Sequence, residues 1–117
     1  MDLVSMCFAL SDTTRFRLLE LLLKRDYCVR ALSRKLGISE SAVSQHLKVF
    51  KQAGLLTGRK FGYHMHYTIN RQALQDMAAA IEELSQRERE KCTRSDGGCD
   101  EAEFSYCQKY AEDRKEN

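Results

Sequence analysis

Three cysteines near the end of the chain, Cys92, Cys99 and Cys107, are the side chains whose type and spacing most suggest chemistry. Six and seven residues separate them, which is not the spacing of a zinc ribbon. Three thiolates brought together across the Gly-Gly pair at 97–98 would form an all-sulfur site that suits soft metal ions and trivalent arsenic or antimony. Three alternatives stay open: a structural zinc site completed by a tail aspartate or by His66, a thiol-oxidation switch, or no role.

Two further cysteines and a histidine pair are also candidates for metal chemistry. Cys7 lies in a short apolar stretch, where a cysteine is expected to be a small buried hydrophobe rather than a ligand. Cys28 is followed two residues later by Arg30, whose charge would repel a metal ion. His64 and His66 share one face of a predicted strand, as a metal-binding pair would, although exposure to solvent is the expected state.

The size and charge of the chain limit what these residues can serve. A length of 117 residues allows one compact domain with a tail, and so small a core favours dimerisation. Residues 1–70 carry 11 lysines and arginines against 5 acids (+6), whereas residues 71–117 carry 8 against 12 (−4). The basic part suits a polyanion. With no membrane-length apolar run and no secretory signal in the sequence, we expect a cytoplasmic protein without a membrane partner.

The first half of the chain is predicted to form short helices. Residues 3–10 are apolar, and the run from Ser11 to Thr14 is a typical N-cap cluster for a second helix. A third helix is predicted over residues 29–36, with Gly37 as its C-terminal stop. A fourth begins after the N-cap Ser39 and ends near Gly54.

One face of the fourth predicted helix is polar. Val43, Leu47 and Phe50 recur at helical spacing and are expected to face the core. The opposite face carries no acidic residue and consists of Ser41, Ser44, Gln45, Lys48 and Lys51, with His46 near the boundary. Hydroxyl, amide and imidazole groups can contact base edges in a DNA major groove, and lysines can neutralise phosphates.

After residue 55 the hydrophobic period changes from that of a helix to that of a strand. Alternation from Tyr63 to Ile69 predicts a β-hairpin with a first arm at about 55–60 and its tip at residues 61–62. Arg59 and Lys60 lie near that tip, where they can reach a phosphate backbone.

A long helix is expected next, capped by Asn70. Its apolar stripe requires a partner and consists of Leu74, Met77, Ile81 and Leu84. The chain then becomes polar, and the spacing of Asp100 and Glu103 predicts a short last helix.

A helix, a glycine turn and a second helix followed by a basic hairpin form the arrangement of a winged helix-turn-helix. Within this arrangement, residues 9–15 read ALSDTTR and residues 36–47 read LGISESAVSQHL. Both runs resemble the ArsR/SmtB family. The resemblance covers about residues 3–85, including Ala53 to Leu56 and Gly62 to Tyr67, and leaves the cysteine-bearing tail outside.

The resemblance implies a homodimeric repressor that leaves its operator when an inducer binds. It implies a dimer interface on the first and fifth helices, which here would contain Leu3, Met6, Leu74, Met77, Ile81 and Leu84. It also implies base contacts by Ser41, Ser44, Gln45 and His46, with Arg59 and Lys60 on the wing. Some relatives sense arsenite through late cysteines, which favours inducer capture by Cys92, Cys99 and Cys107.

The chain departs from the family pattern at three places. Tyr63 follows the wing glycine where arginine is usual, so minor-groove reading by the wing loses its support. Arg30 replaces the second cysteine of the third-helix metal motif, which reads Cys28-Val29-Arg30. No histidine occurs between residues 71 and 90, so the fifth-helix zinc site is absent.

The sequence therefore predicts a mainly α protein with a small β-hairpin, dimeric through its first and fifth helices. A winged helix-turn-helix domain is expected over residues 1–90 and a cysteine-containing tail over residues 91–117. The expected function is repression without catalysis, through double-stranded operator DNA and without a cofactor for DNA binding. The expected inducer is As(III), Sb(III) or a soft divalent metal. A thiol-redox-responsive repressor and a winged-helix protein-interaction module remain alternatives.

Overall fold

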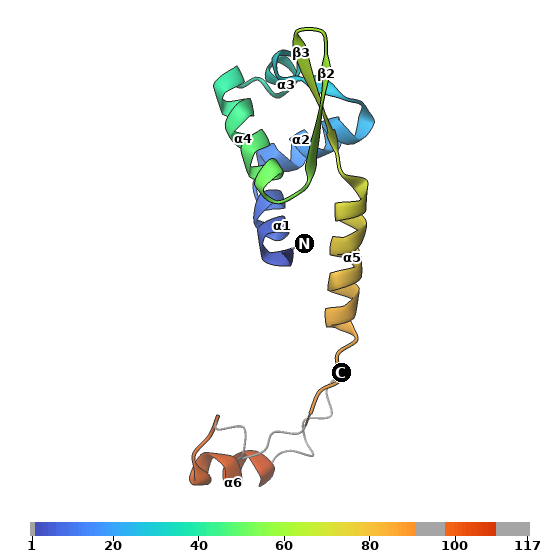
Figure 1. Cartoon of the computed structure of the whole chain (residues 1–117). Helices are drawn as coiled ribbons and strands as arrows, with labels where there is room; N and C mark the ends of the chain where they lie inside the picture. Colours follow the sequence, from blue (N-terminus) through green and yellow to red (C-terminus); the bar gives the residue numbers. More distant parts are fainter. Residues whose placement is uncertain (1, 91–97, 110–117) are drawn as a thin grey trace. The chain divides into compact units, whose positions relative to one another are not determined.

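Helices and one small sheet account for most of residues 2–90 and 98–109, which the computed structural model describes. The chain divides into two compact units, Met1–Gln86 and Arg87–Asn117. In the first unit lie the helices α1 (Leu3–Leu10), α2 (Thr13–Lys24), α3 (Val29–Leu36), α4 (Glu40–Gln52) and α5 (Arg71–Ser85). The same unit holds the strands β1 (Tyr27–Cys28), β2 (Leu56–Phe61) and β3 (His64–Ile69). The hairpin of β2 and β3 is labelled in Figure 1. The second unit contains α6 (Glu101–Lys109).

Side-chain caps fix where the helices of the first unit begin. Asp12 accepts a hydrogen bond from the backbone N–H of Arg15 at 3.0 Å, and Ser39 accepts one from Ala42 at 3.0 Å. Asn70 caps α5 through Ala73 in the same way. These bonds satisfy N–H groups that have no partner within a helix. The predicted N-caps Ser39 and Asn70 are confirmed, as is the predicted cap cluster ahead of α2.

A left-handed glycine separates α3 from α4. Gly37 has φ +68°, a backbone conformation that residues with a Cβ rarely adopt, and its N–H bonds the carbonyl of Ser33. The Ser33 hydroxyl also donates to the carbonyl of Ile38. The predicted glycine stop is confirmed, and it sets the angle at which α4 leaves α3.

The sheet has the order β1-β3-β2 and is antiparallel throughout. Tyr27 pairs with Tyr67 and Cys28 with His66, so β1 ties the start of α3 to the hairpin. β1 was not predicted from the sequence. Its two-residue length is too short for a periodic signal. The hairpin tip lies at Gly62 and Tyr63, one residue later than predicted, because Phe61 still pairs with His64.

The core lies between the inner face of the sheet and the helices. Val43, Leu47 and Phe50 of α4 are buried there, as predicted. Leu18 and Leu22 of α2 complete the same cluster. Packing of this kind anchors α4 along its whole length and leaves its opposite face to solvent.

A buried arginine joins α1 to α2. The Arg15 side chain is 9% exposed, and its Nε donates to the carbonyl oxygen of Ala9 at 2.8 Å. One terminal nitrogen donates to the carbonyl oxygen of Phe8 at 3.1 Å, with the guanidinium over the Phe8 ring. These bonds satisfy carbonyls at the C-terminal end of α1 and fix α1 against α2.

The short last helix begins with a reciprocal cap. Asp100 accepts from the N–H of Glu103 at 2.8 Å, and the Glu103 carboxylate accepts from the N–H of Asp100 at 3.1 Å. This is the capping box predicted from the spacing of the two acids.

Candidate nucleic-acid interface

The outward face of α4 presents the polar side chains predicted for it. Five of them are exposed, namely Ser41, Ser44, Gln45, Lys48 and Lys51, and His46 is half-buried at the edge of the face. The buried stripe of α4 fixes the rotation of the helix about its axis, so these side chains share one surface. That surface has hydrogen-bonding groups for base edges and two ammonium groups for phosphates.

One acidic residue lies close to this face and was left out of the sequence prediction. Glu40 is exposed in the first turn of α4, where a carboxylate interacts favourably with the helix dipole. Together with Cys28, Arg30 and His64 it lines a shallow hollow below the wing tip. The negative charge is therefore confined to the N-terminal end of α4.

The two basic residues of the wing lie on opposite faces of the hairpin. Arg59 pairs with His66 and Lys60 with Met65, and alternate residues of a strand point to opposite sides. The Arg59 guanidinium lies 5.7 Å from the centroid of the Phe61 ring. Both basic residues are exposed, and Tyr63 at the tip is fully exposed. The wing therefore presents a charge on each side and an aromatic ring at its end.

A histidine–aspartate pair lies on the outer face of the sheet. His66 Nδ1 is 2.9 Å from Asp26 Oδ2, and the two side chains are 31% and 48% exposed. The hydrogen bond with His66 lowers the pKa of the Asp26 carboxyl, assisted by the charge of Arg59. His66 was expected to face solvent, and it is half-buried beside Asp26. Its partner is 40 residues away in the sequence, and no local pattern indicates such a pair.

Apolar side chains of α1 and α5 remain exposed in the single chain. Val4 is 76% exposed and Phe8 62%, and together with α4 residues they line a groove of about 320 Å³. On α5, Ile81 and Leu84 are each 47% exposed. Such a surface is typical of a site covered by another protein chain.

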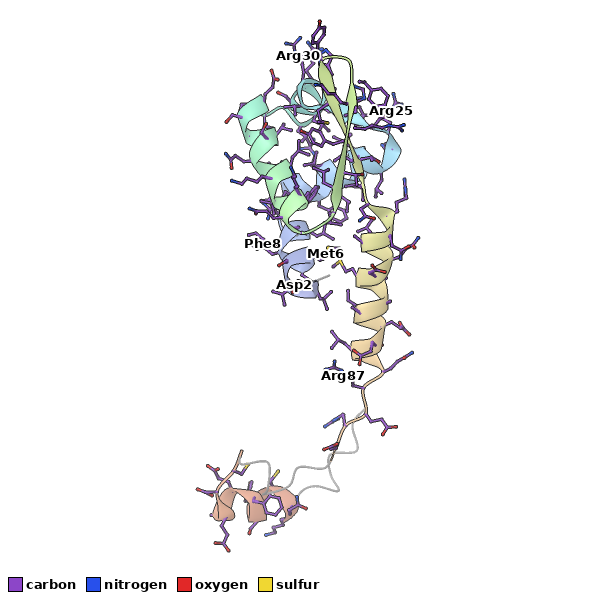
Figure 2. All side chains as sticks on the ribbon, viewed as in Figure 1. Asp2, Met6, Phe8, Arg25, Arg30 and Arg87 are labelled. Carbon is purple, nitrogen blue, oxygen red and sulfur yellow. The ribbon has the colours of Figure 1, made fainter. Side chains whose placement is uncertain are left out.

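The six residues predicted for the dimer interface differ in how exposed they are. Leu3, Leu74 and Met77 are half-buried within the chain. Met6 is fully buried against the core and offers no surface to a partner, contrary to the expectation for it. In Figure 2 its side chain and that of Phe8 lie on opposite sides of α1. Val4 and Phe8, which were not predicted for the interface, are the large apolar residues that α1 exposes.

The cysteines are distributed over both units. Cys7 is exposed on α1, so the expectation of a buried hydrophobe was wrong: α1 buries Met6 and Ala9 and turns Cys7 outward. Cys28 is half-buried and precedes α3. Cys99 and Cys107 are half-buried in the second unit, and Cys92 lies outside the described residues. Within residues 2–90 and 98–109, no three metal-ligating side chains gather at one point.

Comparison with known proteins connects this geometry to a family. The family model described as "Bacterial regulatory protein, arsR family" matches residues 12–57, from the start of α2 into β2. The transcriptional repressor SdpR of Bacillus subtilis is 34% identical over 68 residues, which are 58% of this chain and 76% of SdpR. The transcriptional activator HlyU of Vibrio cholerae is 32% identical over 76 residues, covering 65% and 70%.

A solved structure gives the same fold. A crystal structure described as "Possible transcriptional regulator for arsenical resistance" superposes with a TM-score of 0.62 at 34% identity, over 68% of this chain and 83% of that one. The matched region covers 76% of the length of SdpR and 46% of the length of a second curated relative. No helix among the described residues is both long and apolar enough to cross a bilayer.

Proposed function

Since this chain belongs to the arsR family of bacterial regulatory proteins, a family of DNA-binding transcriptional regulators and not of enzymes, we propose that it is an arsenite-released operator repressor. The proposed protein binds double-stranded operator DNA as a homodimer. As(III), Sb(III) or another soft thiophilic ion releases it. No cofactor is required for DNA binding.

The exposed face of α4 is the observation that carries the DNA-binding part of the proposal. In the proposed complex, Ser41, Ser44, Gln45 and His46 contact base edges in the major groove. Lys48 and Lys51, with Arg59 and Lys60 on the wing, bind phosphates. These cations displace counterions from DNA, so the affinity should fall steeply as salt is added.

The proposed inducer site consists of Cys92, Cys99 and Cys107. Trivalent arsenic prefers thiolate ligands, and each thiol would replace one hydroxyl of arsenous acid with release of one water, so no oxidant is required. The resemblance to a structure described as "Possible transcriptional regulator for arsenical resistance" supports this choice of ion.

Fluorescence anisotropy measures how tightly the reduced chain binds DNA from its own promoter, with and without arsenite. We expect tight, salt-dependent binding that arsenite reverses. A variant with serine at positions 92, 99 and 107 should bind the operator equally well and lose the arsenite response. Cys28→Ser is the matched control and should respond like the original chain.

Each other outcome has a defined meaning. Arsenite release that persists in the triple-serine variant would move the site to Cys7 or Cys28. Operator binding that arsenite, antimonite and soft divalent metals all leave unchanged would contradict the inducer assignment and retain the repressor. Binding to no promoter DNA, or binding without salt dependence, would favour a winged-helix protein-interaction module.

A thiol-redox-responsive repressor is the second candidate, and the exposure of Cys7 on α1 favours it. An exposed thiol next to an apolar surface is accessible to peroxide and to a second copy of the same thiol. This alternative predicts release from DNA by diamide or peroxide, reversal by dithiothreitol, and insensitivity to arsenite. Cys7→Ser should abolish that response.

A further inference from the structure

A basic groove lies on the outer face of the sheet. The end of α2, the turn into β1, the strands β2 and β3, and the first residue of α5 line a groove of about 430 Å³. All of these segments belong to the first compact unit. Four of the lining residues are cations, namely Lys24, Arg25, Arg59 and Arg71.

The positive charge of this groove is not neutralised by the chain itself. Asp26 is the carboxylate that lines it, and its hydrogen-bond partner is His66. Among the described residues, none of the four cations has a carboxylate within salt-bridge distance. With His66 neutral, the lining therefore carries a net charge of +3, counted from four cations and one carboxylate. A concave surface of one sign concentrates ions of the opposite sign.

Existing contacts hold several of the charged groups in place. Arg71 donates to the carbonyl oxygen of Leu23 at 2.8 Å. The Arg25 guanidinium lies 5.9 Å from the centroid of the Tyr27 ring, and that of Arg59 lies 5.7 Å from Phe61. Guanidinium groups that are already oriented lose less entropy when they bind an oxyanion.

An aromatic surface adjoins the cations. Phe61 is 47% exposed, and its ring centroid is 4.9 Å from that of His66. Leu22 and Leu23 add apolar lining from α2. A ligand that fits this groove combines an anionic oxygen group with a planar apolar body.

The groove opens on a different side of the wing from the core and α4. Arg59, Phe61 and His66 share the outer face of the hairpin by register, whereas Tyr67 and Ile69 point to the core in which α4 is packed. Figure 2 shows Arg25 on the side of the first unit opposite to α4. DNA bound along α4 therefore does not fill the groove.

We propose that this groove is a binding site for a small organic anion, one carboxylate or phosphate group carried on an aromatic ring. The oxyanion contacts Arg25, Arg59 and Arg71, and the ring stacks on Phe61. This inference goes beyond the proposed operator and inducer sites, and it concerns residues that belong to neither the α4 face nor the cysteines, apart from Arg59.

Phenyl phosphate is a suitable probe for the full-length reduced chain, with inorganic phosphate as the comparison. Two-dimensional ¹H–¹⁵N NMR titrations should show saturable shift changes in residues 22–26, 59–61 and 66–71. Phenyl phosphate should bind several-fold more tightly than inorganic phosphate because only it can stack on Phe61. Phe61→Leu should remove that preference and retain the binding of both anions.

Arg25→Gln should weaken phenyl phosphate binding about tenfold, the loss expected for one charge-assisted hydrogen bond. Arg17→Gln is the matched control: it removes one exposed positive charge from α2 outside the groove, and its affinity for the probe should not change. Equal losses in the two variants, or shift changes that do not saturate, would overturn the proposal in favour of general charge screening.

The groove could instead bind phosphate groups of the DNA backbone, and the same variants distinguish the two cases. If operator DNA displaces phenyl phosphate and Arg25→Gln reduces the salt dependence of operator binding, the groove holds the DNA backbone and the small-anion assignment is wrong. If Arg25→Gln loses the probe and keeps full operator affinity, the proposal holds. A failed probe titration with intact operator binding contradicts this inference alone and leaves the proposed repressor function standing.

Discussion

Gln45 lies exposed between Ser44 and His46 on α4 and is the residue best suited to read a base. Its amide can donate and accept at once, as adenine requires in the major groove. We predict that Gln45→Ala weakens operator binding by about 1 to 3 kcal/mol and leaves binding to random DNA nearly unchanged.

Anisotropy on operator and scrambled duplexes measures both quantities. Gln75→Ala is the matched control because it removes the same amide from an exposed position of α5, outside α4 and the wing. A loss of equal size on both duplexes would argue for a structural role of Gln45 and against base reading.

The Asp26–His66 pair predicts how stability depends on pH. The hydrogen bond with His66 lowers the pKa of Asp26 in the folded chain, so this pair stabilises the fold above the unfolded value of about 3.9. The stabilisation is lost as the pH falls through the lower folded value. The difference in unfolding free energy between the original chain and Asp26→Asn should therefore shrink between pH 6 and pH 3.

Urea unfolding at the two pH values measures that difference. Repeating the comparison in a His66→Asn background serves as the control, since it removes the main cause of the shift. The pH dependence assigned to Asp26 should be smaller there. An unchanged dependence in that background would assign the effect to a group other than this pair.

At the scale of elements, the turn between α3 and α4 depends on one glycine. Gly37 has φ +68°, and a Cβ placed on it would meet no atom within 4 Å, so only the backbone conformation opposes substitution. We predict that Gly37→Ala lowers the unfolding free energy by about 1 kcal/mol.

Gly58→Ala tests whether that cost belongs to the left-handed conformation. Its Cβ would lie 3.2 Å from the sulfur of Met65, the mobile end of a side chain that is 42% exposed and can shift. Chemical denaturation should give a smaller loss for Gly58→Ala than for Gly37→Ala. The reverse order would mean that the contact of the new Cβ with Met65 costs more than the left-handed conformation at Gly37.

Elements with a clear hydrophobic period were predictable from the sequence, and those without one were not. The polar face of α4 was predicted correctly because that helix is amphipathic. Its buried residues Val43, Leu47 and Phe50 recur at helical spacing. In α1 most positions are apolar, so the pattern could not distinguish the buried Met6 from the exposed Phe8 and Cys7.

Contacts between segments far apart in the sequence were the other part that could not be predicted. The pairing of β1 with β3, the Asp26–His66 hydrogen bond and the groove beside them depend on tertiary packing. The spacing of residues along the sequence does not predict such contacts. The placement of Arg59 and Lys60 on opposite faces of the wing could have been predicted, because alternate residues of a strand point to opposite sides.

At the scale of the whole molecule, the exposed apolar residues of α5 predict self-association. Burying Leu84 in a two-fold symmetric interface removes it from water in both copies. Leu84→Glu should therefore weaken the dimer by about a hundredfold or more, measured by analytical ultracentrifugation.

Gln75→Glu is the control for the added charge. It lies nine residues before Leu84 in α5, which is half a turn around the helix, and it is exposed. This variant should sediment like the original chain. A chain that is monomeric from the start, or dissociation caused equally by both variants, would show that α5 does not form the interface.

The hydrogen bonds of Arg15 determine how the contact between α1 and α2 responds to added salt. The Arg15 guanidinium donates to the carbonyl oxygens of Phe8 and Ala9, and a charged donor makes each bond stronger than one between neutral groups. Because the side chain is 9% exposed, dissolved ions weaken these bonds little. Added salt should therefore change the packing of α1 against α2 little. In a dimer built on α1, this contact would hold α2 and the core packed on it in place as the ionic strength changes.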